Sequence, residues 1–130
     1  MAADRILVDT SIIIEFFRKK KKDESVLHDL LASTSVLYIS TVTYFELLSG
    51  AKSAALLNDT MKLMALFEII DLSAREAKTA AEIFQNLKQR NAMIGLADIF
   101  IAATAVAHDL PLASLNHSHF ERITNLQIIT

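Results

Sequence analysis

The sequence predicts an α/β protein: a mainly parallel sheet of four to five strands, covered by helices on both faces as a three-layer α/β/α sandwich. Short apolar runs alternate along the chain with longer segments of helical periodicity, which is typical of strands joined by crossover helices. The first run, residues 6–8, is wholly apolar, as expected for a strand buried on both faces. Two glycines and one proline among 130 residues leave no candidate linker, so residues 1–130 are predicted to form one domain.

The same patterns assign the elements in order. Strands are expected at residues 6–8, 36–40, 68–72, 111–115 and 127–129. Helices are expected at residues 12–17, 25–34, 40–49, 54–67, 74–91 and 95–107, with a short helical segment near 116–120. The helix at 74–91 is predicted to begin with a capping box, Ser73-x-x-Glu76, in which each side chain accepts a hydrogen bond from the other residue's backbone N–H.

The composition limits the partners and surroundings of the chain. The formal net charge of −2 gives no overall attraction for nucleic acid, so such a contact must come from a local basic patch. The absence of cysteine excludes disulfides, thiolate metal sites and a cysteine nucleophile, and fits a cytoplasmic protein. No apolar run is long enough for a membrane span, and no signal peptide is recognisable. Hydrophobic residues make up 52% of the chain, more than a small body easily buries, which favours a homo-oligomer.

Three acidic residues lie at or near the starts of predicted helices. Asp9 and Glu46 do so just after a strand, and Asp98 lies in the first turn of a helix that is apolar nearly all round. Each has a structural explanation: Asp9 as a helix cap, Glu46 in a Thr43-x-x-Glu46 capping box, and Asp98 as a charge at the positive end of its helix. Asp98, however, has no obvious partner, and a buried carboxylate without one is costly.

The three acids also have a shared explanation. Helices that follow parallel strands begin at the same edge of the sheet, where ligand sites of open α/β sheets form, so the three carboxylates can converge there. Clustered carboxylates resist joint ionisation unless a cation neutralises them. Oxygen ligands without cysteine suit Mg²⁺ or Mn²⁺, which would activate a water molecule for displacement at a phosphoryl group.

Five adjacent cations, residues 18–22, follow the first predicted helix. They are compatible with a solvated helix end, where cations complement the helix dipole. They are equally compatible with a contact to a phosphate backbone, since five are more than a helix end needs.

Four motifs occur in order along nearly the whole chain. They are Val8-Asp9-Thr10-Ser11, Glu46-Leu47-x-x-Gly50, Ala97-Asp98-Ile99-x-Ile101-Ala102-Ala103-x-Ala105 and Ser114-x-Asn116-x-x-His119-Phe120. Together they resemble the PIN-domain family, and within it the VapC-like toxins of type II toxin–antitoxin pairs. The resemblance implies a Mg²⁺- or Mn²⁺-dependent endoribonuclease that is usually a homodimer and is blocked by a small antitoxin. It assigns metal binding and orientation of the attacking water to Asp9, Glu46 and Asp98.

The last motif departs from the family pattern. Many relatives have a fourth acid at the position of Asn116 or directly before the phenylalanine, where this chain has His119. The site is therefore less negative, and a second metal would be held weakly. Asn116 is expected to assist catalysis by bonding a metal-bound water or a phosphate oxygen. The residues expected to contact the RNA substrate are Thr10, Ser11, Arg18, Lys19, Lys20 and Ser114.

Two alternative functions remain at this point. The missing fourth acid leaves open a non-catalytic PIN-like module that binds RNA or a protein. Another doubly wound domain, such as a phosphoacceptor receiver or a nucleotide binder, is disfavoured because the chain has no Gly-rich phosphate loop. His119 is compatible with a phosphate contact, although a single histidine in a turn is more often structural, and His108 is expected at the surface or in packing.

Overall fold

The computed structural model describes residues 4–130 and contains one five-stranded sheet of order β3-β2-β1-β4-β5. Every neighbouring pair of strands is parallel. The strands are β1 (Arg5–Val8), β2 (Val36–Ser40), β3 (Glu68–Ile70), β4 (Leu112–Ala113) and β5 (Ile128–Ile129). The chain builds the sheet outward from β1 to β3 and then returns to the other side of β1. The carboxyl ends of β1 and β4 therefore form a topological switch point, the usual place for a site in such a sheet.

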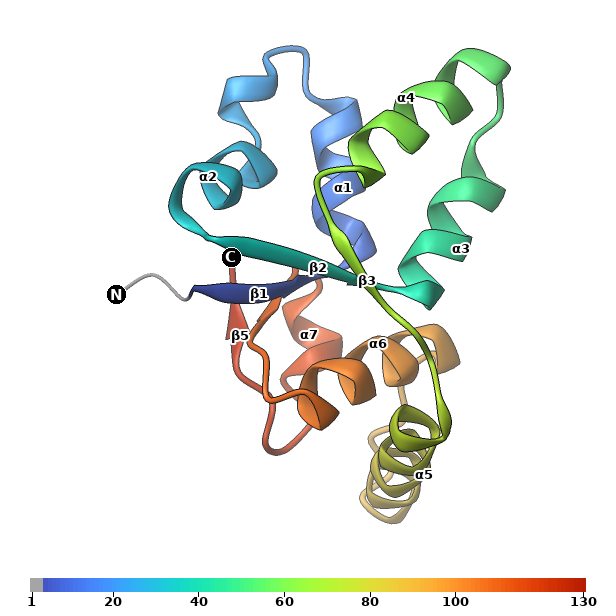
Figure 1. Ribbon diagram of the computed structural model, residues 1–130. Coiled ribbons are helices and arrows are strands. Elements are labelled where there is room, and N and C mark those ends of the chain that lie inside the picture. The colour runs from blue at the N-terminus through green and yellow to red at the C-terminus, as the bar shows by residue number, and fades with distance from the viewer. Residues whose placement is uncertain (1–3) are drawn as a thin grey trace.

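The helices cover both faces of the sheet, which confirms the three-layer prediction (Figure 1). Figure 1 shows α1–α4 on one face and α5–α7 on the other. A short 3-10 turn, η1 (Lys22–Glu24), links the first two helices. The helices are α1 (Thr10–Arg18), α2 (Val26–Ser33), α3 (Thr41–Gly50), α4 (Ala54–Met64), α5 (Ala74–Gln89), α6 (Leu96–Ala107) and α7 (His117–Phe120).

Successive residues of β1 supply the two cores, because side chains alternate between the faces of a strand. Ile6 and Val8 belong to the core beneath α1–α4, and Leu7 belongs to the core with α5–α7. All three are almost completely buried, as the apolar run predicts for a central parallel strand. Within residues 4–130, no helix combines the length and the hydrophobicity needed to cross a membrane.

Some elements are shorter than predicted. The helix expected at 54–67 ends at Met64, because the backbone N–H groups of residues 65–67 bond to carbonyls three residues earlier and tighten the chain into a turn. Phe67 still reaches the core with 8% exposure. The strand expected at 111–115 shrinks to Leu112–Ala113, because its ladder with β5 spans only two residue pairs.

The predicted capping box of α5 is present and is linked to α6. Glu76 accepts from the Ser73 backbone N–H at 2.8 Å, and its other oxygen lies 2.7 Å from His108 Nε2. Burial by itself would raise the pKa of the Glu76 carboxyl, but hydrogen bonds from Ser73 and His108 outweigh it and lower the pKa to about 2. His108 is thus a packing residue with a definite partner, which joins the end of α6 to the start of α5.

Candidate functional site

Asp9 lies where β1 ends and acts as the N-cap of α1. Only 3% of the residue is exposed. Its Oδ2 atom accepts from the Ser11 backbone N–H at 3.4 Å, the Ser11 hydroxyl at 2.6 Å and the Ser114 hydroxyl at 2.8 Å. The capping interpretation is therefore correct, but it uses only one of the two carboxylate oxygens.

Glu46 lies in the second turn of α3, so the alternative Thr43–Glu46 capping box is wrong. The cap of α3 is Ser40, whose hydroxyl accepts from the Thr43 backbone N–H at 3.1 Å. The Oε1 atom of Glu46 instead accepts from the Thr10 hydroxyl at 2.7 Å. Thr10 also lies 3.0 Å from the Thr43 hydroxyl. Glu46 is thereby tied to the residue that follows Asp9.

Asp98 lies in the first turn of α6, as predicted, with 20% of its side chain exposed. It has a partner that the sequence did not indicate: its Oδ2 atom lies 2.9 Å from His119 Nδ1. The Asn116 amide approaches the same ring nitrogen at 3.2 Å, and the Asn116 backbone N–H donates to the Ser114 hydroxyl at 2.9 Å. A chain of polar contacts thus runs from Asp98 through α7 to Ser114 and Asp9.

The three acids share one feature. Each has one oxygen held by a side chain of the protein, and the other oxygen has no hydrogen-bond partner among residues 4–130. In the same part of the chain, no lysine or arginine lies within ion-pair distance of any of them. Asp9 is almost fully buried, and a buried carboxylate needs a compensating charge. The free oxygens of the three acids form a donor set that fits Mg²⁺ or Mn²⁺.

The side chains do not yet form a closed metal site. Within residues 4–130, no three His, Asp or Glu side chains are gathered closely enough to hold an ion as they stand. Glu46 is held by Thr10 and Asp98 by His119. Binding of one ion by all three acids would require their free oxygens to come closer together.

The hydroxyl residues predicted to contact substrate form hydrogen bonds inside the protein instead. Ser114 is fully buried and donates to Asp9, so the structure contradicts its contact with RNA. Thr10 is 9% exposed and is used by Glu46. The Ser11 hydroxyl donates to Asp9 and accepts from the Leu115 backbone N–H at 3.0 Å. All three hydroxyls orient the acids and the loop after β4, because their hydrogen-bonding capacity is already committed.

The basic run divides into two parts. Lys22 donates to the carbonyls of Phe16 and Phe17 at 2.6 and 3.1 Å and lies over the Phe16 ring, so it stabilises the end of α1. Lys20 is exposed. Arg18 and Lys19 line a hollow of about 580 Å³ along α1, here called the α1 groove, together with Ser11, Ile14, Glu15 and Leu115. The basic run therefore meets the neighbourhood of Asp9 only through its first two members.

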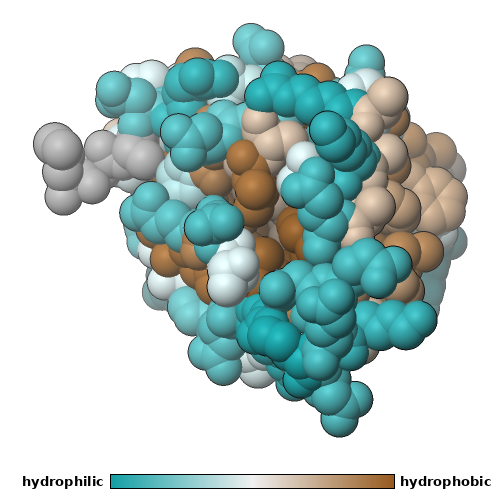
Figure 2. All heavy atoms as spheres, turned by 90° about the horizontal axis from the view of Figure 1, so that it is seen from below, coloured by the Kyte–Doolittle hydropathy of each residue, from teal (hydrophilic) through white to brown (hydrophobic). Residues whose placement is uncertain are grey.

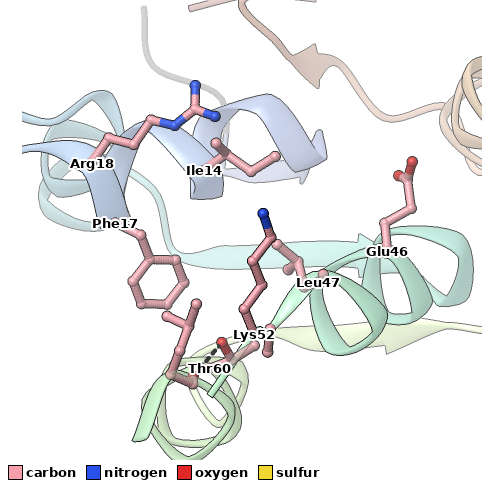
Figure 3. A pocket seen from close by; sticks show the side chains of 10 residues that line it. Ile14, Phe17, Arg18, Glu46, Leu47, Lys52 and Thr60 are labelled. Carbon is pink, nitrogen blue, oxygen red and sulfur yellow. Dashed lines mark hydrogen bonds between the residues drawn. The ribbon is translucent and has the colours of Figure 1, made fainter.

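A second hollow, here called the α3 groove, has a volume of about 380 Å³ and lies between α1, α3 and α4. Figure 3 shows Lys52 reaching up between its walls, with Arg18 on the α1 side and Glu46 at one end. Ile14 and Arg18 line both grooves. Lys52, which lies in none of the sequence motifs, is a further cation in a groove that has Glu46 at one end.

Comparison with known proteins agrees with this architecture. Residues 6–126 match the PIN domain family. Ribonuclease VapC1 of Rickettsia felis is 34% identical over 132 residues, covering 96% of this chain and 95% of the relative. The structure of VapBC2 from Rickettsia felis bound to a DNA fragment from their promoter matches with a TM-score of 0.83 and 26% identity, over 96% of this chain and 97% of that chain. A toxin-antitoxin complex from Klebsiella pneumoniae matches with a TM-score of 0.77 and 29% identity over 96% of both chains. The chain thus belongs to the PIN domain family, among its VapC-like members.

Proposed function

We propose that this chain is a Mg²⁺- or Mn²⁺-dependent endoribonuclease that acts as the toxin of a toxin–antitoxin pair. The observation that carries the proposal is the free oxygen on each of Asp9, Glu46 and Asp98, next to a switch point of the sheet and without a lysine or arginine partner in residues 4–130. The names of the related ribonucleases support the reaction class. The toxin–antitoxin complex among the similar structures supports the biological role.

In this proposal the three carboxylates bind the ion, which supplies Lewis-acid activation of water and neutralises charge on the phosphoryl group. Ser11 and Ser114 keep Asp9 in place, and Thr10 keeps Glu46 in place. Asn116 remains the fourth predicted member of the site. Its amide lies beside His119, at the Asp98 end of the contact chain, from where it can donate to a phosphate oxygen.

The substrate path follows the cations that are not used internally. Arg18 and Lys19 flank the α1 groove, and Lys52 stands in the α3 groove. A phosphate backbone lying along α1 would reach Arg18 about 13 Å from Asp9, given the rise of an α-helix. Cations at this distance position RNA without reading its sequence.

Cleavage of RNA with and without metal tests the proposed function. The purified protein, freed of metal with a chelator, should cut single-stranded RNA only after Mg²⁺ or Mn²⁺ is restored, and calorimetry should show the ion binding at millimolar or lower concentration. Asp98→Asn should remove both properties. Cleavage that persists in the chelator would contradict the metal mechanism. Absence of both binding and cleavage would leave the non-catalytic PIN-like module.

Expression in a bacterial host tests the biological role. The parent protein should arrest growth, because uncontrolled RNA cleavage stops translation. The Asp98→Asn variant, produced at the same level, should not. Normal growth in the presence of an active nuclease would contradict the toxin role while leaving the enzymatic activity in place. A small protein encoded beside the toxin should relieve the arrest by covering its acids.

We also propose that two copies of this chain form a homodimer. Phe45 is 67% exposed and Leu96 is 61% exposed, and they lie one and two residues before Glu46 and Asp98 respectively. Their helices, α3 and α6, are in contact. Figure 2 shows hydrophobic surface extending over the right-hand side of the molecule, seen from the side of the sheet on which α5–α7 lie in Figure 1. Burying this surface against a second copy would remove it from water.

A further inference from the structure

One contact of the site joins α7 to Asp98, one of the three acids. His119, from α7, places its Nδ1 atom 2.9 Å from Asp98 Oδ2, on α6, although the two residues are 21 positions apart. The position directly before Phe120 thus holds a polar ring aimed at a carboxylate.

The chemistry of the contact fixes the direction of the hydrogen bond. An ionised carboxylate only accepts, so the proton must lie on Nδ1 and the ring must donate to Oδ2. Asn116 cannot then donate to the same nitrogen. The 3.2 Å contact fits an amide turned so that its oxygen faces the ring. This turn only exchanges the amide oxygen and nitrogen, which are nearly identical in outline. Nε2 is left as the free ring nitrogen.

Packing alone does not explain the position of His119. Its side chain is 42% exposed. The four-residue helix α7 is anchored by Phe120, which is completely buried, and not by the imidazole. The only hydrogen-bond contacts of the ring within residues 4–130 are with Asp98 and Asn116, both predicted site residues.

We propose that His119 is a positioning residue that holds Asp98 Oδ2, so that Asp98 offers the divalent ion a single oxygen in a fixed orientation. His119 does for Asp98 what Thr10 does for Glu46 and what Ser11 and Ser114 do for Asp9. A side chain that ligates a metal ion binds it more tightly when a neighbouring hydrogen-bond donor fixes the orientation of that side chain. The inference rests on the proposed metal-dependent nuclease and adds the residue that orients one of its three acids.

Substitutions at residue 119 test this role with a built-in control for geometry. The amide nitrogen of Asn lies close to where Nδ1 is, whereas that of Gln lies closer to Nε2. His119→Ala and His119→Gln should weaken Mn²⁺ binding, measured by calorimetry, by about 10- to 100-fold, while His119→Asn should stay within about threefold of the parent. Cleavage at saturating Mn²⁺ and RNA should fall far less than the affinity for Mn²⁺. His117→Ala, an exposed neighbour in α7, should leave the affinity unchanged.

The outcomes separate this inference from the proposed function. A parent protein that binds Mn²⁺ and cuts RNA, with His119→Ala equal to it in Mn²⁺ affinity, would overturn the positioning role alone. Equal losses in the Asn and Gln variants would also overturn it. A parent that neither binds metal nor cuts RNA would overturn both. If His119→Ala does not fold, the Asn and Gln variants decide. Long-range ¹H–¹⁵N spectra of the metal-free parent at pH 8 should show the proton on Nδ1, and a proton found only on Nε2 would contradict the geometry.

Discussion

At the residue scale, one carboxylate oxygen of Asp9 caps α1 and the other is available to the proposed metal site. Oδ2 caps α1 and receives Ser11 and Ser114, while Oδ1 has no partner among residues 4–130. The sequence presented capping and metal binding as alternatives, whereas the structure allows both. What the sequence could not provide is the partner of Asp98, because the contact with His119 depends on how α7 is placed against α6.

Asp9→Asn should separate these two uses. Asparagine caps helices as well as aspartate, so the free energy of unfolding should change by less than about 1 kcal/mol. The lost charge should reduce RNA cleavage by roughly 100-fold or more, because a few kcal/mol of charge stabilisation correspond to that factor. Thermal unfolding and a cleavage assay measure the two effects. Asp59→Asn, at an exposed position of α4, is the matched control and should cut at the parental rate.

At the element scale, the apolar patterns were enough to place most helices and strands, because burial on one or both faces determines them. Element ends were less predictable. Both Ser40 and Thr43 qualify as a cap by residue type, and the cap fell to Ser40 because β2 extends to that residue. The five-cation run was also ambiguous, because only the packing of η1 shows that Lys22 bonds back to the carbonyls at the end of α1.

The two parts of the basic run should respond differently to mutation. Arg18→Ala or Lys19→Ala should weaken RNA binding and reduce the slope of log K against log salt by about 0.7 for each lost phosphate contact on a single strand. Lys22→Ala should leave that slope unchanged and lower the melting temperature, since it removes bonds to two helix carbonyls. Fluorescence titrations at several salt concentrations measure the slopes. Equal slopes for Arg18→Ala and the parent would exclude the α1 groove as the RNA path.

The Glu76–His108 contact between α5 and α6 predicts that the stability of the fold depends on pH. Glu76 has a pKa of about 2 in the folded protein, below its ordinary value of 4.5. The unfolded chain therefore binds a proton first as the pH falls, and stability is lost from about pH 4.5 down to about pH 2. Between pH 6 and pH 3 the loss should be on the order of 2 kcal/mol, and Glu76→Gln should remove most of it. Urea unfolding at pH 6 and pH 3 checks this, with Glu82→Gln, an exposed residue of α5, as control.

At the scale of the whole molecule, the fold class and the mainly parallel sheet followed from the apolar patterns, and the family followed from four ordered motifs spread over the chain. Convergence of the three acids was predicted from topology alone, and the structure brings them to linked positions without closing a metal site. The last step depends on bringing the free oxygens of Glu46 and Asp98 toward Asp9, which no spacing in the sequence specifies. Thr10 and His119 each hold only one carboxylate oxygen, so the other oxygen of each acid is left for the ion.

The proposed homodimer depends on the hydrophobic surface around Phe45 and Leu96. Phe45→Ser should shift the protein from dimer to monomer in sedimentation velocity, because it removes the most exposed aromatic side chain of α3 from the contact. Leu57→Ser, an exposed leucine of α4, should leave the dimer intact. A parent protein that sediments as a monomer at 100-fold the concentration used in the cleavage assay would exclude this interface.

Anomalous diffraction from crystals soaked in Mn²⁺ tests most directly whether Asp9, Glu46 and Asp98 share one ion. The expected result is a single strong peak about 2.1 Å from Asp9 Oδ1 and Asp98 Oδ1, with Glu46 turned toward it directly or through a water. The hydrogen bonds from Ser114 to Asp9 and from His119 to Asp98 should remain. A protein that cuts RNA while its Mn²⁺ peak lies elsewhere, or that shows no peak near any of the three acids, would contradict the proposed site.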